Sequence, residues 1–258
     1  MSVILNEVKN LVESMGWKTE ILRLMPQNDI ATQSPGGGEV IFSNPMGKYL
    51  IIGCGHFGSR AAKQLLKKKS HPKITAVDKN REAIKKLSHL SIDTIVDDGL
   101  SYLNQFLSEG QTVNYLIPSV PFHLAFEFIL LRLKPFGARR AKVPSLSGLP
   151  NPEIGKTGDL YTSFADFLCP EDCPGPAQYC TVTRKKREKP LYDILRDLKG
   201  PFESRVIISQ PLAIGVGGFQ PKELLALLED VKKQKNSHDL ILISTASRCH
   251  GVTSALSL

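Results

Sequence analysis

The segment YLIIGCGHFGSRAAKQL, residues 49–65, limits what this chain can fold into more than any other part of it. An unbroken apolar run ends at Gly53, and a segment with helical periodicity begins within the next few residues. Between them, GCGHFG fits the pattern G-x-G-x-x-G. In that pattern the first glycine permits a tight turn, the second lets backbone approach a pyrophosphate, and the third lets helix and strand pack closely. The segment therefore predicts a strand–turn–helix unit that binds a dinucleotide.

The same alternation of apolar runs and helical segments continues down the chain. Further strands are expected at residues 73–78, 93–96 and 113–118, and a fifth at 140–144 after a helix at 121–133. Strands that are apolar throughout and separated by helices are typical of a parallel sheet covered on both faces. We therefore expect an α/β fold with a doubly wound parallel, Rossmann-like sheet.

Asp78 ends the second predicted strand and indicates the type of dinucleotide. A carboxylate at this point accepts hydrogen bonds from the adenosine ribose and disfavours a 2′-phosphate, which favours NAD. Lys79 and Arg81 follow closely, and a nearby cation could accommodate that phosphate, so NADP stays an alternative. The pattern would also suit S-adenosylmethionine, or a domain that binds no nucleotide.

The residues predicted to contact the cofactor lie in the turns at the carboxyl ends of the first three strands. Two acids that follow the third strand are placed near the adenine, although either could instead cap a helix. The predicted cofactor-binding residues are Gly53, Gly55, His56, Phe57, Gly58, Asp78, Lys79, Asp97 and Asp98.

This part of the chain resembles the N-terminal NAD(P)-binding domain of Trk-type potassium-uptake regulators, the RCK family. The resemblance is carried by YLIIGCGHFGSRAAKQL, ITAVDKNREAI and IVDDG, and it covers about residues 47–135. It implies a Rossmann domain and a bound dinucleotide. It also implies a non-catalytic role, in which the protein senses NAD and reports to a partner.

The chain divides into three predicted parts: an N-terminal appendage at 1–45, the dinucleotide-binding domain at 46–144, and a remainder at 145–258. The appendage has a short amphipathic helix and a flexible SPGGGE break. The remainder begins with an irregular insertion rich in cysteine, proline and glycine. Further α/β elements then follow, and we expect them to extend the same sheet; they are helices near 187–198 and 221–233 and strands near 205–209 and 240–244.

The segment CPEDCPGPAQYC spaces Cys169, Cys173 and Cys180 within an extended loop, and RCHG adds Cys249 near the end of the chain. Four thiols suffice to ligate zinc or an iron–sulfur cluster. Free thiols in a surface loop, or a Cys169–Cys173 redox pair, are the alternatives. Stable disulfides are the least favoured reading, because no secretory signal precedes them.

A catalytic site is expected only where a nicotinamide ring would project, at the turn PSVPFH after the fourth strand. Ser119 and His123 are the polar groups there, and a histidine can serve as the acid–base group for hydride transfer. His123 could instead lie in the first turn of a helix, bonded or exposed. Two functions stay open: an oxidoreductase for an unknown small-molecule substrate, or a non-catalytic NAD sensor with a protein partner.

Charge and hydropathy narrow the remaining partners. The net charge of +8 comes largely from the short runs KKK, RKKREK and KKQK, which are not interleaved with the aromatic residues of a nucleic-acid platform. No apolar run approaches the roughly 20 residues that span a bilayer, and the first residues do not resemble a signal peptide. We therefore expect a cytoplasmic protein; the sequence is also compatible with a homo-oligomer.

Overall fold

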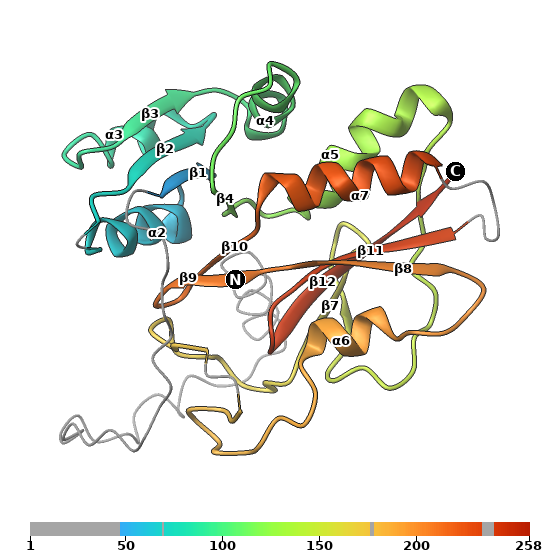
Figure 1. The fold of residues 1–258 in the computed structure, drawn as a ribbon. Helices are drawn as coiled ribbons and strands as arrows, with labels where there is room; N and C mark the ends of the chain where they lie inside the picture. Colours follow the sequence, from blue (N-terminus) through green and yellow to red (C-terminus); the bar gives the residue numbers. More distant parts are fainter. Residues whose placement is uncertain (1–46, 69, 176–177, 234–239) are drawn as a thin grey trace.

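A computed structural model of the protein describes residues 47–68, 70–175, 178–233 and 240–258. The predicted amphipathic helix and flexible break of the N-terminal appendage lie outside these residues. The described chain forms two main β-sheets with helices packed around and between them (Figure 1).

The first sheet is the predicted parallel sheet, and its fold class is confirmed. Its strands are β1 (Lys48–Ile52), β2 (Lys73–Asp78), β3 (Asp93–Val96) and β4 (Tyr115–Pro118), in the order β3-β2-β1-β4 and all parallel. The chain leaves β1 toward β2 on one side and returns to β4 on the other. The carboxyl ends of β1 and β4 therefore form the switch point at which such sheets bind ligands.

Helices cover this sheet on both faces because successive side chains of β1 point in opposite directions. Leu50 and Ile52 share a core cluster with α4 (Gly99–Ser108). Tyr49 and Ile51 share another with α2 (His56–Leu66). The short helix α3 (Arg81–Lys85) connects β2 to β3.

Six of the strands after residue 138 form a second sheet, which corrects the expectation that this part of the chain extends the first. Its order is β6-β7-β12-β11-β8, with β5 also paired to β12. Only β8 and β11 run parallel, and the other pairs are antiparallel. The strands are β5 (Arg139–Ala141), β6 (Glu153–Ile154), β7 (Leu160–Ser163), β8 (Glu203–Ile208), β11 (Leu240–Ala246) and β12 (His250–Ser257).

A backbone bridge at the outer edge of β4 explains why the predicted fifth strand does not join the first sheet. The backbone N–H of Leu116 donates to Phe219 at 2.8 Å, and the N–H of Phe219 donates back at 3.0 Å. This bridge brings the hairpin of β9 (Gln210–Ala213) and β10 (Val216–Gly218) against β4. The predicted strand at 140–144 instead pairs as β5 with the end of β12.

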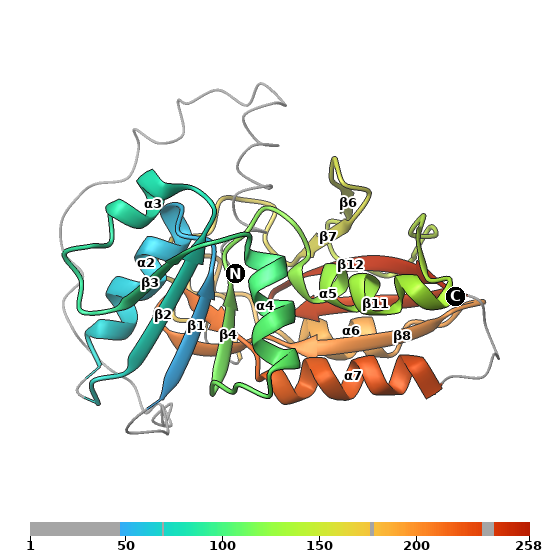
Figure 2. The same cartoon turned by 90° about the horizontal axis from the view of Figure 1, so that it is seen from above.

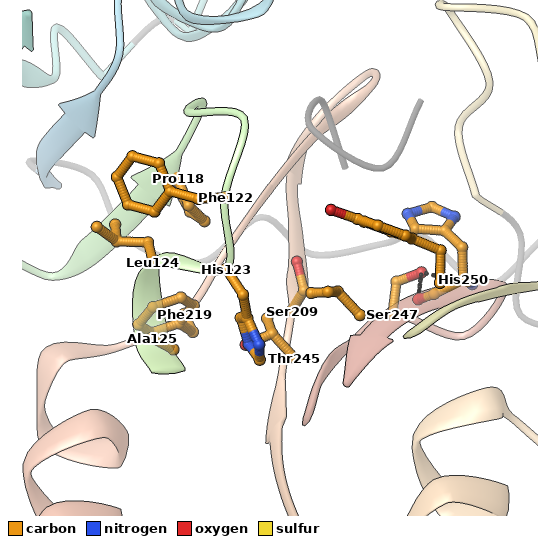
Figure 3. A pocket seen from close by; sticks show the side chains of 12 residues that line it. Pro118, Phe122, His123, Leu124, Ala125, Ser209, Phe219, Thr245, Ser247 and His250 are labelled. Carbon is orange, nitrogen blue, oxygen red and sulfur yellow. Dashed lines mark hydrogen bonds between the residues drawn. The ribbon is translucent and has the colours of Figure 1, made fainter. Parts of the chain in front are cut away.

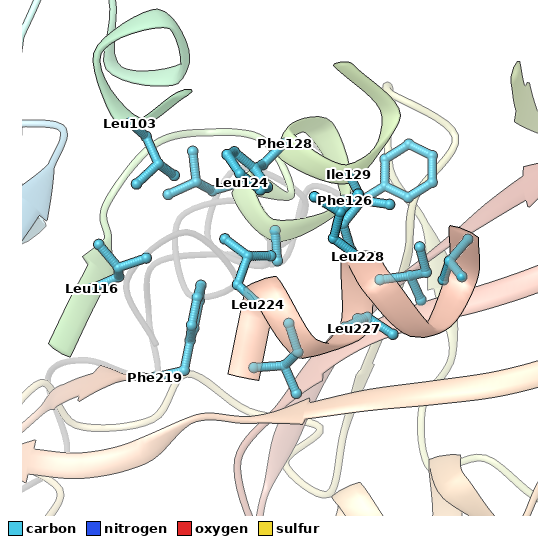
Figure 4. Close-up of a cluster of buried hydrophobic side chains, with 14 of the residues drawn as sticks. Leu103, Leu116, Leu124, Phe126, Phe128, Ile129, Phe219, Leu224, Leu227 and Leu228 are labelled. Atoms are coloured by element: carbon cyan, nitrogen blue, oxygen red, sulfur yellow. The ribbon is translucent and has the colours of Figure 1, made fainter. Parts of the chain in front are cut away.

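The two sheets share one hydrophobic core. Helices α5 (Leu124–Leu133) and α7 (Pro221–Lys233) lie over the second sheet (Figure 2), and their apolar side chains meet those of α4 and β4 (Figure 4). Ile241 and Ile243 of β11 face this core. Leu242 faces the other way, toward α6 (Leu191–Arg196), as the period of two along a strand requires.

Candidate functional site

The three glycines of the predicted phosphate-binding turn have three different surroundings. Gly53 has a φ of 97°, and a Cβ there would lie 2.4 Å from the carbonyl oxygen of Ser119. A Cβ on Gly58 would lie 1.8 Å from the carbonyl oxygen of Gly53, so a side chain would prevent α2 from approaching β1 this closely. Gly55 has no atom within 4 Å of its Cβ position. Open space therefore lies where the pattern requires room for a pyrophosphate.

The N-terminus of α2 follows this turn directly. Gly55 is the N-cap of α2 and supplies no side-chain cap, and the first turn of α2 carries no acidic residue. The N–H of Ser59 donates to the carbonyl of Gly55 at 3.0 Å, which starts the intrahelical ladder. The N–H groups before Ser59 have no intrahelical acceptor, and together with the helix dipole they suit an anion.

Asp78 lies at the carboxyl end of β2, and its carboxylate holds the glycine turn in place. Oδ2 accepts the N–H of Cys54 at 2.6 Å, and Oδ1 accepts the N–H of Asn80 at 2.8 Å. Asn80 in turn caps α3 by accepting from the N–H groups of Glu82 and Ala83. The predicted ribose partner is thus half-buried beside the glycine turn.

The remaining predicted cofactor residues after β2 and β3 are exposed. Asp98 accepts the N–H of Ser101 at 3.0 Å and is the N-cap of α4, which is the capping role left open by the sequence. Asp97 accepts the N–H of Asp98 at 2.7 Å. Lys79 is exposed next to Asp78.

His56 and Phe57 occupy the first turn of α2, with their rings nearly perpendicular and their centroids 5.1 Å apart. Nε2 of His56 lies 2.9 Å from Oε1 of Glu171, and Nε of Arg60 lies 3.6 Å from Oε2 of the same carboxylate. Glu171 belongs to the cysteine-rich insertion. The insertion therefore rests on the start of the helix that would hold the phosphates, a contact that no local sequence pattern indicates.

His123 lies at the N-terminus of α5 and is buried, with both ring nitrogens engaged. Nδ1 is 2.8 Å from the hydroxyl of Ser254, and Nε2 is 2.9 Å from the hydroxyl of Thr245. Burial lowers the pKa of His123 to about 4, so the ring is neutral at pH 7. Figure 3 shows the ring directed toward Thr245, beside a small cavity that also meets Pro118.

Ser119, the other predicted catalytic residue, contributes backbone to the switch point. Its N–H donates to the carbonyl of Ile52 at 2.7 Å, and its own carbonyl lies against Gly53. The structure therefore places Ser119 beside the glycine turn. His123 lies deeper, between the first sheet and the second.

A buried ionic network that the sequence analysis did not single out continues from His123. The hydroxyl of Ser254 donates to Asp159, which is fully buried, and Arg140 donates to the same carboxylate at 2.6 Å. Arg140 also pairs with Glu127 of α5. Despite burial, the hydrogen bonds from Ser254, Thr157 and Arg140 lower the pKa of Asp159. This network ties α5 to the second sheet.

The four cysteines outside the glycine turn meet at one cavity of about 440 Å³, which we call the thiol cavity. Cys169, Cys173 and Cys180 come from the insertion, and Cys249 comes from the turn between β11 and β12. All five cysteines of the chain are free thiols. The sequence analysis grouped these four cysteines as one set of ligands, and in the structure all four line the same cavity.

The thiol cavity is not shaped around a single metal ion. Within residues 47–68, 70–175, 178–233 and 240–258, no three His, Cys, Asp or Glu side chains are arranged to hold one. This geometry does not support the predicted zinc ligation, although the four thiols line one cavity. Burial and the neighbouring thiols raise the pKa of Cys169 to about 11, since four thiolates in one cavity would repel each other.

Cys180 differs from Cys169 because backbone donors face its sulfur. The N–H of Thr183 lies 3.5 Å from Sγ, and although burial opposes it, hydrogen bonds from Thr183 and Val182 lower the pKa of Cys180. Sγ of Cys173 lies 3.4 Å from the hydroxyl of Thr181 in the same turn. The turn after Cys180 therefore favours the thiolate form.

Within the described part of the chain, no helix is long and apolar enough to cross a membrane.

Comparisons with known proteins match both halves of the chain. The TrkA-N domain matches residues 49–103, which contain the glycine turn, Asp78 and Asp98. A second family, described as "Uncharacterized protein, C-terminal domain", matches residues 125–258 and so includes the second sheet and the thiol cavity. An uncharacterized protein of Archaeoglobus fulgidus is 29% identical over 219 residues, which cover 80% of this chain and 98% of the relative.

Proposed function

The chain belongs to the family that the C-terminal domain at residues 125–258 defines, and we propose that it is a regulatory protein that senses NAD(H). The dinucleotide would bind at the glycine turn of its TrkA-N segment. Residues 46–144 would bind the nucleotide. Residues 145–258 would contact a partner in a way that depends on whether the nucleotide is bound. The observation that carries this proposal is the open space at Gly55 in front of the N-terminus of α2.

The two other glycines support the same assignment. Gly53 and Gly58 lie where a side chain would clash with backbone, and Gly55 lies where a side chain would meet only open space. Packing alone requires glycine at residues 53 and 58 but not at residue 55. A pyrophosphate bound beside Gly55 would supply the missing reason.

Asp78 supports NAD over NADP. Its carboxylate lies beside the glycine turn, where a ribose 2′-hydroxyl would donate to it and a 2′-phosphate would be repelled. Lys79 is exposed next to Asp78. We therefore propose NAD(H) as the ligand.

The surroundings of His123 support a sensor over an oxidoreductase. An acid–base group must hand a proton to a substrate, but both nitrogens of His123 already lie within 3 Å of hydroxyl groups in the protein interior. These bonds give the residue a role in joining α5 to the second sheet. We therefore do not propose hydride transfer to a substrate.

Glu171 offers a way for bound nucleotide to reach the second half of the chain. Its carboxylate pairs with His56 and Arg60 at the start of α2, and a pyrophosphate in front of the same helix would bring like charge close to it. Binding would therefore weaken the contact between the insertion and α2. The position of the insertion would then report whether the nucleotide site is filled.

Isothermal titration calorimetry of the full chain with NAD⁺, NADH, NADP⁺ and ATP tests the proposal. We expect NAD⁺ or NADH to bind more tightly than NADP⁺ and ATP. Gly55→Val, which fills the open space, should weaken binding roughly tenfold or more, the equivalent of about 1.4 kcal/mol.

The control for that variant is Gly110→Ala at the end of α4. Its Cβ also enters open space, but its φ of 71° makes the substitution costly to the fold, and it follows the C-terminal end of α4 rather than the glycine turn. It should lose stability and keep nucleotide affinity. Failure of all four nucleotides to bind the wild-type chain would overturn the proposal.

A further inference from the structure

We propose that Cys169, Cys173, Cys180 and Cys249 hold an iron–sulfur cluster in the thiol cavity, beside the nucleotide site. The proposal concerns a different site from the glycine turn and does not depend on nucleotide binding.

The first argument is that the four thiols come together from distant parts of the chain. Cys249 follows β11, far from the insertion in sequence, yet it lines the same cavity as the other three. A backbone hydrogen bond fixes this approach, since the N–H of Phe164 donates to the carbonyl of Cys249 at 2.9 Å. Four thiols around one space are the complete protein ligand set of a [4Fe–4S] or [2Fe–2S] cluster.

The second argument is the room beside the thiols. The cavity that the four cysteines line has a volume of about 440 Å³, which is more than a single ion needs. A cluster of several iron and sulfide atoms fills more of such a space than one zinc ion does.

The third argument is the turn that presents Cys180. Residues 178–187 form a small hairpin, in which the N–H of Cys180 donates to Lys185 at 2.9 Å and the N–H of Arg184 donates back to Cys180 at 2.9 Å. The residues of its tip direct N–H groups at Sγ, as the 3.5 Å contact from Thr183 shows. Hydrogen bonds to ligand sulfurs stabilise thiolates and tune cluster potentials.

The fourth argument is the charge around the cavity. A cluster with four thiolate ligands is an anion, and Lys185, Lys186 and Arg187 line the same cavity. His250 also lines it, and its buried Nε2 has no hydrogen-bond partner among the described residues. A buried polar atom without a partner is costly, and a cluster sulfur would give this N–H an acceptor.

The test uses the full chain purified without oxygen and then reconstituted with ferrous iron, sulfide and a thiol reductant. We expect iron and acid-labile sulfide in equal amounts, broad absorption near 400 nm, and an electron paramagnetic resonance signal after reduction with dithionite. Cys169→Ser and Cys249→Ser should each lose most of the bound iron.

Cys54→Ala is the matched control, because this buried thiol in the glycine turn lies outside the cavity, and burial raises its pKa to about 12. It should retain the cluster. Stoichiometric zinc without iron, or no metal after reconstitution, would overturn the proposal. Equal iron loss in Cys54→Ala and Cys249→Ser would also overturn it. Because the wild-type measurement needs no variant, the test stands even if a serine variant fails to fold.

Discussion

Glu171 in the cysteine-rich insertion lies 2.9 Å from His56 in the first turn of α2, and this pair joins the two halves of the chain beside the glycine turn. Arg60, one turn along α2, lies 3.6 Å from the same carboxylate. The carboxylate thus occupies the neighbourhood in which we place the phosphates of NAD(H).

Removing the charge of Glu171 should strengthen nucleotide binding. Because the pair is half-exposed, its contribution is small, and we expect Glu171→Gln to raise NADH affinity about three- to fivefold, near the ~1 kcal/mol limit for exposed pairs. Glu188→Gln, an exposed carboxylate of the same insertion, is the control and should leave affinity unchanged. Calorimetry at low and high salt measures the effect, which salt should diminish. If Glu171→Gln binds NADH as tightly as the wild type does, the insertion does not influence nucleotide binding.

Gly58 and Gly55 should respond in opposite ways to the same substitution. Gly58→Ala places a methyl group 1.8 Å from a backbone oxygen and should lower the free energy of unfolding by about 1–3 kcal/mol. Gly55→Ala enters open space with a φ of −61° that any residue adopts, so stability should stay within about 0.5 kcal/mol while NADH affinity falls. Urea denaturation beside calorimetry measures both quantities. Equal destabilisation by the two variants would contradict the geometry of the turn.

Asp78→Ala should weaken NAD⁺ binding by about 1–3 kcal/mol, the cost of leaving a buried polar partner unpaired. The variant should also lose stability, because the carboxylate accepts the N–H groups of Cys54 and Asn80. Asp78→Asn keeps an acceptor and separates the two effects. Asp93→Asn is the charge-matched control at the start of the neighbouring strand β3, where its 3.8 Å ion pair with Lys73 is exposed. If Asp78→Asn binds NAD⁺ as the wild type does, Asp78 is not the ribose partner.

Stability should fall as the pH drops from about 6.5 toward 4. The pKa of His123 is lowered to about 4 in the folded protein, against an ordinary value of 6.5, so within this window the unfolded chain binds the proton more readily. The stabilisation is complete above pH 6.5 and is lost as the pH falls. Asp159 and Arg140 are the charged groups nearest the ring. Burial lowers the pKa of His250 as well, to about 3, so it adds to the same loss.

Urea denaturation at pH 7.5 and pH 5 measures this loss, which should reach a few kcal/mol in the wild type. His123→Asn should lose less stability between the two pH values, although it is less stable at both. His89→Asn, which changes an exposed histidine, should keep the full pH dependence. A pH dependence as large in His123→Asn as in the wild type would assign the loss to other groups, since His250 alone should give only part of it.

The first sheet could be predicted from the sequence because its signals are local. Four apolar runs with helical segments between them match β1 to β4 within about two residues, and the glycines of residues 53–58 mark a turn that few other folds need. The grouping of three cysteines within residues 169–180 could be recognised for the same reason, because it lies in one short segment. Asp98 illustrates the limit, because the sequence left cofactor contact and helix capping open, and the structure shows it capping α4.

The second sheet could not be predicted in the same way, because its central strand is not apolar. Thr253 and Ser254 of β12 are fully buried, and their hydroxyl groups are satisfied only by partners from elsewhere: Ser244 on β11, Asp159 and His123. A periodicity of apolar residues does not reveal such a strand. The prediction that these strands extend the first sheet was wrong because it, too, depends on a contact between distant residues. The backbone bridge between Leu116 and Phe219 occupies the edge of β4.

By itself the sequence determined the parallel sheet, the glycine turn and the acid beside it, because residues close together in the chain create those constraints. Only the tertiary structure decided that Glu171 rests on α2, that Cys249 reaches the other three thiols, and that His123 is engaged at both nitrogens. Each of these contacts joins residues more than 60 positions apart. Their formation depends on how two sheets pack around a shared core, which local patterns do not encode.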